Sequence, residues 1–298
     1  FPTRRSSDLN STILGTFKTG GSTIPVHKND DSVATIIARD GDILLSGNPT
    51  DSASTNIYGI KSAKPVYMNA GNNVTLHASI QHNNTDEVSV IRAGNDFVMQ
   101  NGQQQARLEI NGPGEVLISA GRNVDLGNTS GILSLANTQN PNLASKSANV
   151  TLLAGMGKSG AAVDAFVAAY IDPAGVGPDT LQGDPAAMAA YRKATATRVQ
   201  AYVNEISGGS NQATGQPYTE QEAMHAFLAM DNTHKEIFAY RQFQSELLSA
   251  GKEYIESAST VRADKLIASL FPAQDYSGDM LMYQSQIRTT RDGNISLF

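Results

Sequence analysis

The sequence predicts a mainly β protein with an α-helical insert: a right-handed parallel β-helix interrupted by a helical segment. Three observations lead to this prediction. A phrase of the form Ala-Gly-x-Asn-Val-x-Leu recurs before residue 155, the hydrophobic pattern takes helical spacing from about residue 161, and the β phrase returns near residue 292. We therefore expect β-helix coils over 11–157, a helical insert over 158–272 and a resumed β-helix over 273–298.

The recurring phrase has three close copies and one looser copy. These are Asn69–Leu76, Arg92–Met99, Ser119–Leu126 and Ser147–Leu152. In the close copies the glycines Gly71, Gly94 and Gly121 are 23 and 27 residues apart. A nearly constant interval of this size is typical of one coil in a solenoid, in which each repeat contacts only its neighbours.

Each position of the phrase has a physical interpretation. We expect the glycine to take a positive φ at a corner, and the following Asn or Asp to bond to nearby backbone or to tolerate a left-handed turn. Val74 and Leu76 then point to one face at a period of two, where stacked coils bury them. Thr75 and Asp125 are expected to face solvent. An antiparallel sandwich also contains short alternating strands, but its hairpins do not require a corner phrase at a constant interval.

Local start and stop signals predict the helices of the insert. Asp184-Pro185 combines an N-cap with proline at the first turn, and Thr219–Glu222 has the pattern of a capping box. Gly208–Pro217 is expected to be a flexible loop. The expected helices are Ala161–Ile171, a helix from Asp184 to Gly208, Thr219–Met230, Lys235–Ser249 and Lys252–Leu270.

Both ends of the chain are expected to be unusual. Residues 1–10 include FPTRRSSDL, which matches a reading frame of a synthetic sequencing adapter, so a non-native tail is expected there. Asp292–Leu297 repeats the corner phrase, and the chain then stops in mid-strand at Phe298. We therefore expect a slice of a longer β-helix.

Composition excludes several classes of function. The net charge is -6 and Arg4-Arg5 is the only basic cluster, so a nucleic-acid partner is not expected. The chain has no cysteine, which excludes disulfides, thiolate zinc sites and cysteine nucleophiles. No apolar run approaches the roughly 18 residues that a membrane-spanning helix needs, so no membrane-spanning segment is expected.

The histidines do not have the spacing of a metal site. His225 and His234 are nine residues apart around a predicted helix break, with Asp231 between them. Two ligands on one helix face would be three or four residues apart. We interpret these two histidines as surface or half-buried, and His77 and His82 as solvated residues beside a turn.

Two other sequence patterns partly match known kinds of site, a phosphate-binding loop and a carboxylate cluster, but each lacks residues that such a site needs. Gly155–Gly160 contains Lys158-Ser159, but a phosphate-binding loop needs glycine at position 152, which is leucine, so we interpret it as a linker. Asp42, Asp96 and Asp125 stand singly at turns or strand positions. Two pairs of adjacent acidic residues also occur: Asp86-Glu87 in a polar loop and Asp30-Asp31 before a strand.

Besides the coils over 41–155, the chain has several distinctive motifs in its later part. These motifs are Tyr240–Phe243, Leu270–Pro272, Tyr276–Asp279, Ser285–Thr289 and Gly293–Leu297. With these residues the chain resembles the filamentous haemagglutinin family of Gram-negative exoproteins: the coils are similar to haemagglutinin-type repeats, and the later motifs resemble a C-terminal-region domain of unknown function in that family. The resemblance covers nearly all of the chain from about residue 11.

The resemblance implies two-partner secretion through an outer-membrane β-barrel transporter, and a secreted or cell-surface location. It also implies adhesion to host-cell or surface ligands. The predicted function is a structural and adhesive segment, a stiff solenoid stalk with a helical decoration, without catalytic, cofactor-binding or metal-binding residues. The alternative is a carbohydrate-active β-helix enzyme, a polysaccharide lyase or hydrolase, which needs clustered carboxylates on adjacent coils.

The helical insert has two possible roles. It is either a lid or platform that packs on the side of the solenoid and shields its core, or a module that binds a partner. Its tyrosines fall mostly at positions compatible with a core, which favours packing, whereas surface aromatic residues would favour binding. The tyrosines in question are Tyr170, Tyr191, Tyr202, Tyr240 and Tyr254.

Overall fold

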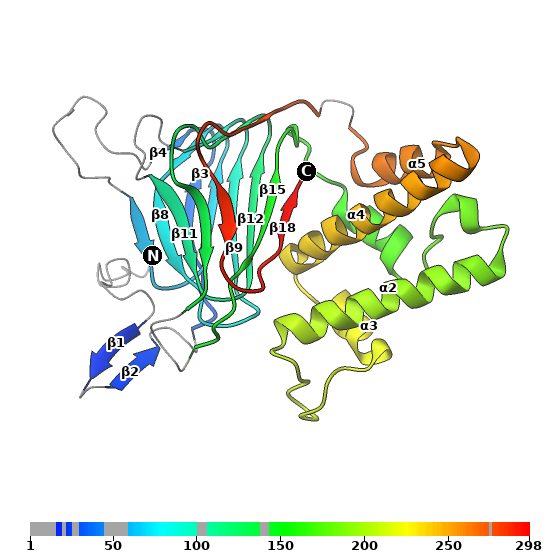
Figure 1. Cartoon of the computed structure of the whole chain (residues 1–298), viewed down its shortest axis with the longest axis horizontal. Coiled ribbons are helices and arrows are strands. Elements are labelled where there is room, and N and C mark those ends of the chain that lie inside the picture. Colours follow the sequence, from blue (N-terminus) through cyan, green and yellow to red (C-terminus); the bar gives the residue numbers. More distant parts are fainter. Residues whose placement is uncertain are drawn as a thin grey trace. The chain divides into compact units, whose positions relative to one another are not determined.

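A computed structural model of the chain (Figure 1) has two compact units. The β unit comprises Phe1–Lys158 and Asp275–Phe298, and the helical unit comprises Ser159–Gln274. The predicted tail at 1–10 lies outside the described residues. The structure describes residues 16–19, 22–25, 30–44, 59–99, 106–137, 143–273 and 276–298.

Most described strands of the β unit form three parallel sheets. Sheet 1 contains β3 (Ala34–Ala38), β6 (Val66–Ala70), β9 (Val88–Ala93), β12 (Glu115–Ala120), β15 (Asn149–Leu153) and β18 (Ile295–Leu297). Sheet 2 contains β4 (Ile43–Leu44), β7 (Val74–Leu76), β10 (Phe97–Met99), β13 (Val124–Asp125) and β16 (Met280–Leu281). Sheet 3 contains β5 (Ile60–Ser62), β8 (Ala78–Gln81), β11 (Arg107–Asn111), β14 (Gly131–Leu135) and β17 (Ile287–Thr289).

Neighbouring strands within each of these sheets are three strands apart in the sequence. The chain therefore visits the three sheets in turn, and we call three successive strands, one from each sheet, a three-strand repeat. Strands β16, β17 and β18 pair with β13, β14 and β15, although the whole helical unit lies between them in the sequence. Among the described strands only β1 (Thr16–Thr19) and β2 (Ser22–Pro25) pair antiparallel, which rules out an antiparallel sandwich for this unit.

The pairing register aligns the apolar positions of the repeats. Val74 pairs with Phe97, and Phe97 pairs with Val124, and all three side chains are buried. Each fully buried side chain of this size contributes about 1.5–3 kcal/mol. Thr75 and Asp125 alternate with the buried positions and are half-buried rather than fully exposed.

The corner glycines have a different role from the one predicted. Gly71, Gly94 and Gly121 do not take a positive φ. Instead, a Cβ on Gly94 would overlap the carbonyl oxygen of Gly71, and one on Gly121 would overlap that of Gly94. Glycine is required here because the backbones of successive corners approach too closely for any side chain.

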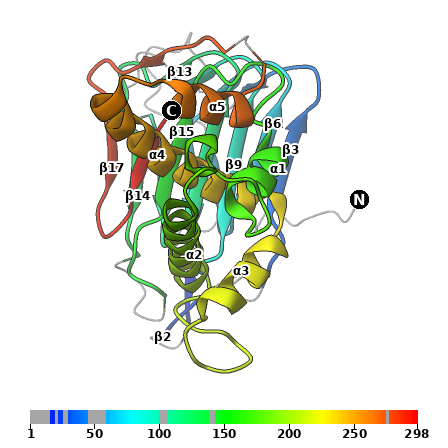
Figure 2. The same cartoon turned by 90° about the vertical axis from the view of Figure 1, so that its right-hand side faces the viewer.

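In the helical unit the described residues form five α-helices (Figure 2), and the chain therefore combines parallel β-sheets with helices. They are α1 (Val163–Phe166), which continues as a π-helical segment (Val167–Ile171), α2 (Pro185–Ile206), α3 (Glu220–Leu228), α4 (Asn232–Ser257) and α5 (Val261–Leu270). A short 3-10 helix spans Asp179–Leu181. The predicted caps are confirmed: the Asp184 carboxylate accepts the N–H groups of Ala186 and Ala187, and Thr219 forms the capping box with Glu222.

The predicted boundary between the last two helices is wrong. The sequence suggested a break near Gly251, whereas α4 runs through that glycine to Ser257. A single glycine in a helix costs only about 1 kcal/mol, and the buried Phe243 and Ala250 on the other face of α4 favour an unbroken helix. The helix ends where Ala258 takes a left-handed conformation with φ 54°.

Aromatic residues form much of the core of the helical unit. The ring of Phe238 lies 4.9 Å from that of Phe227 and 5.2 Å from that of Tyr202. Such pairs contribute about 0.5–1.5 kcal/mol beyond the burial of their area. Of the tyrosines considered above, Tyr254 alone is exposed, by 53%; Tyr170, Tyr191, Tyr202 and Tyr240 are buried. No helix in the described part of the chain has the length and apolar character needed to cross a membrane.

Candidate functional site

A ladder of polar side chains joins the corners of the three-strand repeats. Asp42 accepts the backbone N–H of Asn73 at 2.8 Å, and Asn73 accepts that of Asp96 at 3.1 Å. Asp96 accepts the N–H of Asn123 at 3.0 Å, and Asn123 accepts that of Asp279 at 3.0 Å. We call these five residues the corner ladder. Each member connects one repeat to the next, which differs from the bond within a single turn that the sequence suggested.

The structure corrects the view that the acidic residues of the coils are scattered. Asp42 and Asp96 occupy equivalent positions in the corner ladder. The Asp96 carboxylate also binds the Arg122 guanidinium, with Nε–Oδ1 at 2.9 Å, and this hydrogen bond lowers the pKa of Asp96. The Asp125 carboxylate accepts the N–H of Gly127 at 2.8 Å. These carboxylates therefore hold backbone or a neighbouring cation.

His82 is fully buried, and the prediction that it is solvated is wrong. Its Nδ1 lies 2.8 Å from the Pro113 carbonyl and its Nε2 lies 2.7 Å from the Ser89 hydroxyl. The Ser89 hydroxyl also accepts the N–H of Val66 at 3.2 Å. This arrangement fits a neutral ring that donates from Nδ1 and accepts at Nε2, and burial lowers the pKa of His82 to about 4. Ser89 and His82 hold adjacent strands together inside the β unit.

Glu87 closes the loop that follows His82. Its carboxylate accepts the N–H of Asn83 at 2.7 Å and the side-chain amide of Asn84 at 2.9 Å. Burial raises the pKa of Glu87 to about 7, although these hydrogen bonds act in the opposite direction. Its neighbour Asp86 is exposed, so the predicted acidic pair is divided between two environments.

The other histidines that the structure describes differ in exposure: His77 and His234 are half-buried, and the His77 Nδ1 accepts the Arg107 N–H at 3.1 Å. His225 is exposed on α3. His234 lies at the start of α4, with Nδ1 2.5 Å from Asp231, and this contact lowers the pKa of Asp231 to about 2. Lys158 and Ser159 are exposed where the chain passes from the β unit to the helical unit. Within the described ranges no group of three or more possible ligands could hold a metal ion.

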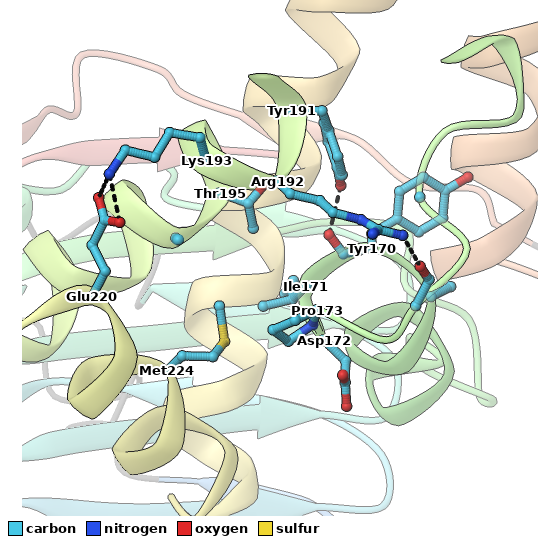
Figure 3. Close-up of a pocket in the computed structure, with 14 residues that line it drawn as sticks. Tyr170, Ile171, Asp172, Pro173, Tyr191, Arg192, Lys193, Thr195, Glu220 and Met224 are labelled. Atoms are coloured by element: carbon cyan, nitrogen blue, oxygen red, sulfur yellow. Dashed lines mark hydrogen bonds and ion pairs between the residues drawn. The ribbon is translucent and has the colours of Figure 1, made fainter. Parts of the chain in front are cut away.

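The helical unit contains a pocket of about 280 Å³ (Figure 3) that the sequence did not reveal. It lies between the end of the π-helical segment, the following loop, α2 and the first turns of α3. Lys193 and Glu220 lie at one end and Arg192 and Tyr170 at the other (Figure 3). Segments far apart in the sequence form this pocket, which is why no local motif predicted it.

Tyr191 fixes one side of the pocket. Its hydroxyl donates to the Tyr170 carbonyl at 2.5 Å, at the end of the π-helical segment (Figure 3). Burial raises the pKa of Tyr191 well above its usual value. The hydroxyl therefore stays protonated and holds α2 against that carbonyl.

A buried ionic cluster lies in the same unit. Glu246 on α4 is only 2% exposed, and its carboxylate is 2.7 Å from Arg262 of α5 and 3.5 Å from Arg198 of α2. Gln242 accepts from Arg198 at 2.9 Å. The sequence offered one signal for this cluster, a glutamate three residues after Phe243 on the buried side of a helix. Because the cluster joins three helices, it stabilises the unit.

An apolar stripe runs along the second half of α4. Leu247, Leu248, Tyr254 and Ile255 are exposed by 40%, 66%, 53% and 84%. The other three follow Leu247 by one, seven and eight residues, a spacing that places all four on one face of the helix, together with Gly251. We call these four residues the α4 stripe. Contiguous exposed apolar residues are typical of an interaction surface.

The chain was compared with protein-family models, with curated proteins and with solved structures. No family model matches it, no curated protein matches it, and no solved structure matches it.

Proposed function

We propose that this chain is a non-enzymatic structural and adhesive segment of a large secreted bacterial surface protein, in which a β-helix supports a helical contact unit. In this proposal the three parallel sheets are the walls of a right-handed parallel β-helix. The strand order supports it, because within these three sheets each strand pairs with the strand three places away in the sequence. Parallel crossover connections are right-handed in nearly all proteins.

The corner ladder is the observation that carries the proposal. It links successive repeats through backbone N–H groups, from Asp42 through Asn73 and Asp96 to Asn123 and Asp279. A stack built in this way gains stiffness by repetition, as solenoids do. The alternative of a polysaccharide lyase or hydrolase needs facing carboxylates that are available to a substrate. Asp42 and Asp96 serve the stack, which favours a supporting role.

The proposal also includes a cellular location and binding partners for the chain. The resemblance of the coil phrase and of the later motifs to filamentous haemagglutinins suggests secretion by a Gram-negative bacterium. The expected partners are an outer-membrane β-barrel transporter and ligands on host cells or other surfaces. The α4 stripe supports a contact role for the helical unit, because Leu248 and Ile255 are exposed by 66% and 84%.

Binding of the purified full chain to cultured epithelial cells tests the contact role. The double variant Leu248→Glu/Ile255→Glu places two charges in the α4 stripe without touching the core. We expect cell binding to fall at least about tenfold, because burying an unpaired charge at an interface is costly. Thermal unfolding should be unchanged, because both side chains are exposed.

Lys252→Glu is the matched control. It changes the net charge by the same amount and alters an exposed residue of the same helix. This variant should bind like the unmodified chain. Equal binding by the stripe variant would contradict the contact role, and cleavage of a polysaccharide by the purified chain would contradict the proposed function as a whole.

A further inference from the structure

Two basic residues, Arg192 and Lys193, line the pocket of the helical unit. Arg192 donates from Nη2 to the Gly175 carbonyl at 3.4 Å, and it forms no ion pair with any residue that the structure describes. Lys193, in contrast, lies 2.7 Å from the Glu220 carboxylate. The Asp172 carboxylate accepts the N–H of Ala174 at 2.8 Å and points away from Arg192 (Figure 3). The Arg192 guanidinium therefore remains available to an anion.

The rest of the pocket is mainly apolar. Ile171 and Met224 lie between its two charged ends (Figure 3), and Ala169, Pro173 and Ala196 complete the wall. Its volume of about 280 Å³ is close to the lower end of the roughly 300–1,000 Å³ that is typical of ligand sites. The pocket therefore suits a small apolar group.

An irregular segment shapes this wall. Val167–Ile171 is π-helical, with the N–H of Asp172 bonded to the Val167 carbonyl at 2.9 Å. Isolated π-helical turns are frequent at functional sites. The loop that follows stays close because Gly175 has no side chain: a Cβ there would overlap the Ala168 carbonyl oxygen. The fold thus keeps the Gly175 carbonyl beside Arg192.

We propose that this pocket binds a small organic anion with an apolar body and a single carboxylate. Arg192 binds the carboxylate, since a guanidinium presents several N–H donors in a planar fork that matches two carboxylate oxygens. The apolar body lies against Ile171 and Met224. Residues of the α4 stripe do not line the pocket, so this site is independent of the proposed contact surface.

Isothermal titration of the full chain with 4-phenylbutyrate, and with its neutral amide as the matched ligand, tests this site. We expect the acid to bind at millimolar or lower concentration and the amide to bind roughly tenfold more weakly, which is the usual effect of losing a charged hydrogen bond. Arg192→Gln should weaken binding of the acid to the level of the amide. Ala196→Leu should fill the pocket and abolish binding of both ligands.

Lys252→Gln provides the control, because it removes an exposed cation that does not line the pocket. Its affinity for the acid should equal that of the unmodified chain. Circular dichroism checks that each variant folds. If Ala196→Leu does not fold, the affinity of Arg192→Gln for the acid alone tests the site. Absence of binding at millimolar acid, equal affinity for acid and amide, or full affinity in Arg192→Gln would each overturn the proposal.

Discussion

Single residues at the corners of the β unit act between repeats. Gly94 makes room for the backbone of the preceding corner, and Asp96 accepts the N–H of Asn123 in the following one. A side chain that bonds to the next repeat stabilises the fold only when that repeat is present. This dependence explains why the corner phrase recurs with both its glycine and its polar residue.

Gly94→Ala tests the close approach at the corner. The added Cβ would overlap the Gly71 carbonyl oxygen, so the backbone must shift, and we expect a loss of about 2 kcal/mol in the free energy of unfolding. Gly251→Ala is the matched substitution on α4, where a Cβ meets nothing within 4 Å. It should be neutral or stabilise by about 0.5–1 kcal/mol. Urea unfolding of both variants measures the difference, and equal stability would contradict the steric role of Gly94.

His82 and Glu87 give the stability of the β unit two opposing dependences on pH. The pKa of His82 is lowered from 6.5 to about 4, so the unfolded chain binds the extra proton first and stability is lost as pH falls from 6.5 towards 4. This loss is on the order of 3 kcal/mol. The pKa of Glu87 is raised from 4.5 to about 7, so its contribution is present below pH 4.5 and is lost as pH rises towards 7.

Glu87→Gln separates these two contributions. Without the Glu87 carboxyl, the effect of His82 is no longer offset, and the free energy of unfolding should rise more steeply between pH 4.5 and 6.5 than in the unmodified chain. Urea titrations at several pH values in this range give the two slopes. Identical slopes would show that Glu87 is not perturbed by burial.

At the scale of secondary-structure elements, α4 has a buried polar face and an exposed apolar face. One face carries Glu246 and packs against α5 through Arg262, and the other carries the α4 stripe. The helix can therefore present apolar residues to a partner while its buried ionic cluster keeps the unit together. The pocket lies elsewhere, between α2, α3 and the loop after the π-helical segment.

Glu246→Gln tests the buried ionic cluster. It leaves the Arg262 guanidinium, whose side chain is 11% exposed, without its closest carboxylate at 2.7 Å. Breaking a buried pair in this way costs about 3 kcal/mol. Glu220→Gln, which breaks an exposed pair with Lys193, should have little effect. Thermal unfolding followed by circular dichroism compares them, and similar melting temperatures for the two variants would contradict the structural role of Glu246.

Elements with local signals could be predicted from the sequence. The start of α2 follows from Asp184-Pro185 and that of α3 from Thr219–Glu222, because capping bonds join residues two or three apart. The end of α4 could not be predicted, since Gly251 is a weak helix breaker and contacts on the other helix face decide the outcome. The burial of His82 depends on Pro113, which is 31 residues away, and no local pattern reports that contact.

The candidate sites were even less visible in the sequence. The corner phrase predicted the positions of the ladder residues, but their bonds connect repeats and not neighbours in the chain. The pocket depends on Tyr170, Arg192 and Met224, which come from three separate segments. Arg192 lies in no recognisable sequence motif, and it is distinguished only by its surroundings in space, where no residue that the structure describes forms an ion pair with it.

At the scale of the whole molecule, two units with different construction share one chain. In the β unit, strands β16, β17 and β18 complete the three sheets after the chain has passed through the helical unit. The polar corner residues connect the successive repeats of these sheets through side-chain-to-backbone hydrogen bonds. In the sequence, the helical unit lies between β15 and β16 of these sheets.

Amide hydrogen exchange at the corners measures whether these hydrogen bonds connect the repeats. The N–H groups of Asn73, Asp96, Asn123 and Asp279 each donate to a ladder side chain of the preceding repeat. Corner amides that faced water would exchange quickly, whereas these four should exchange as slowly as strand amides such as that of Val74. Exchange of all four at the rate of an unprotected amide would contradict the stacked arrangement.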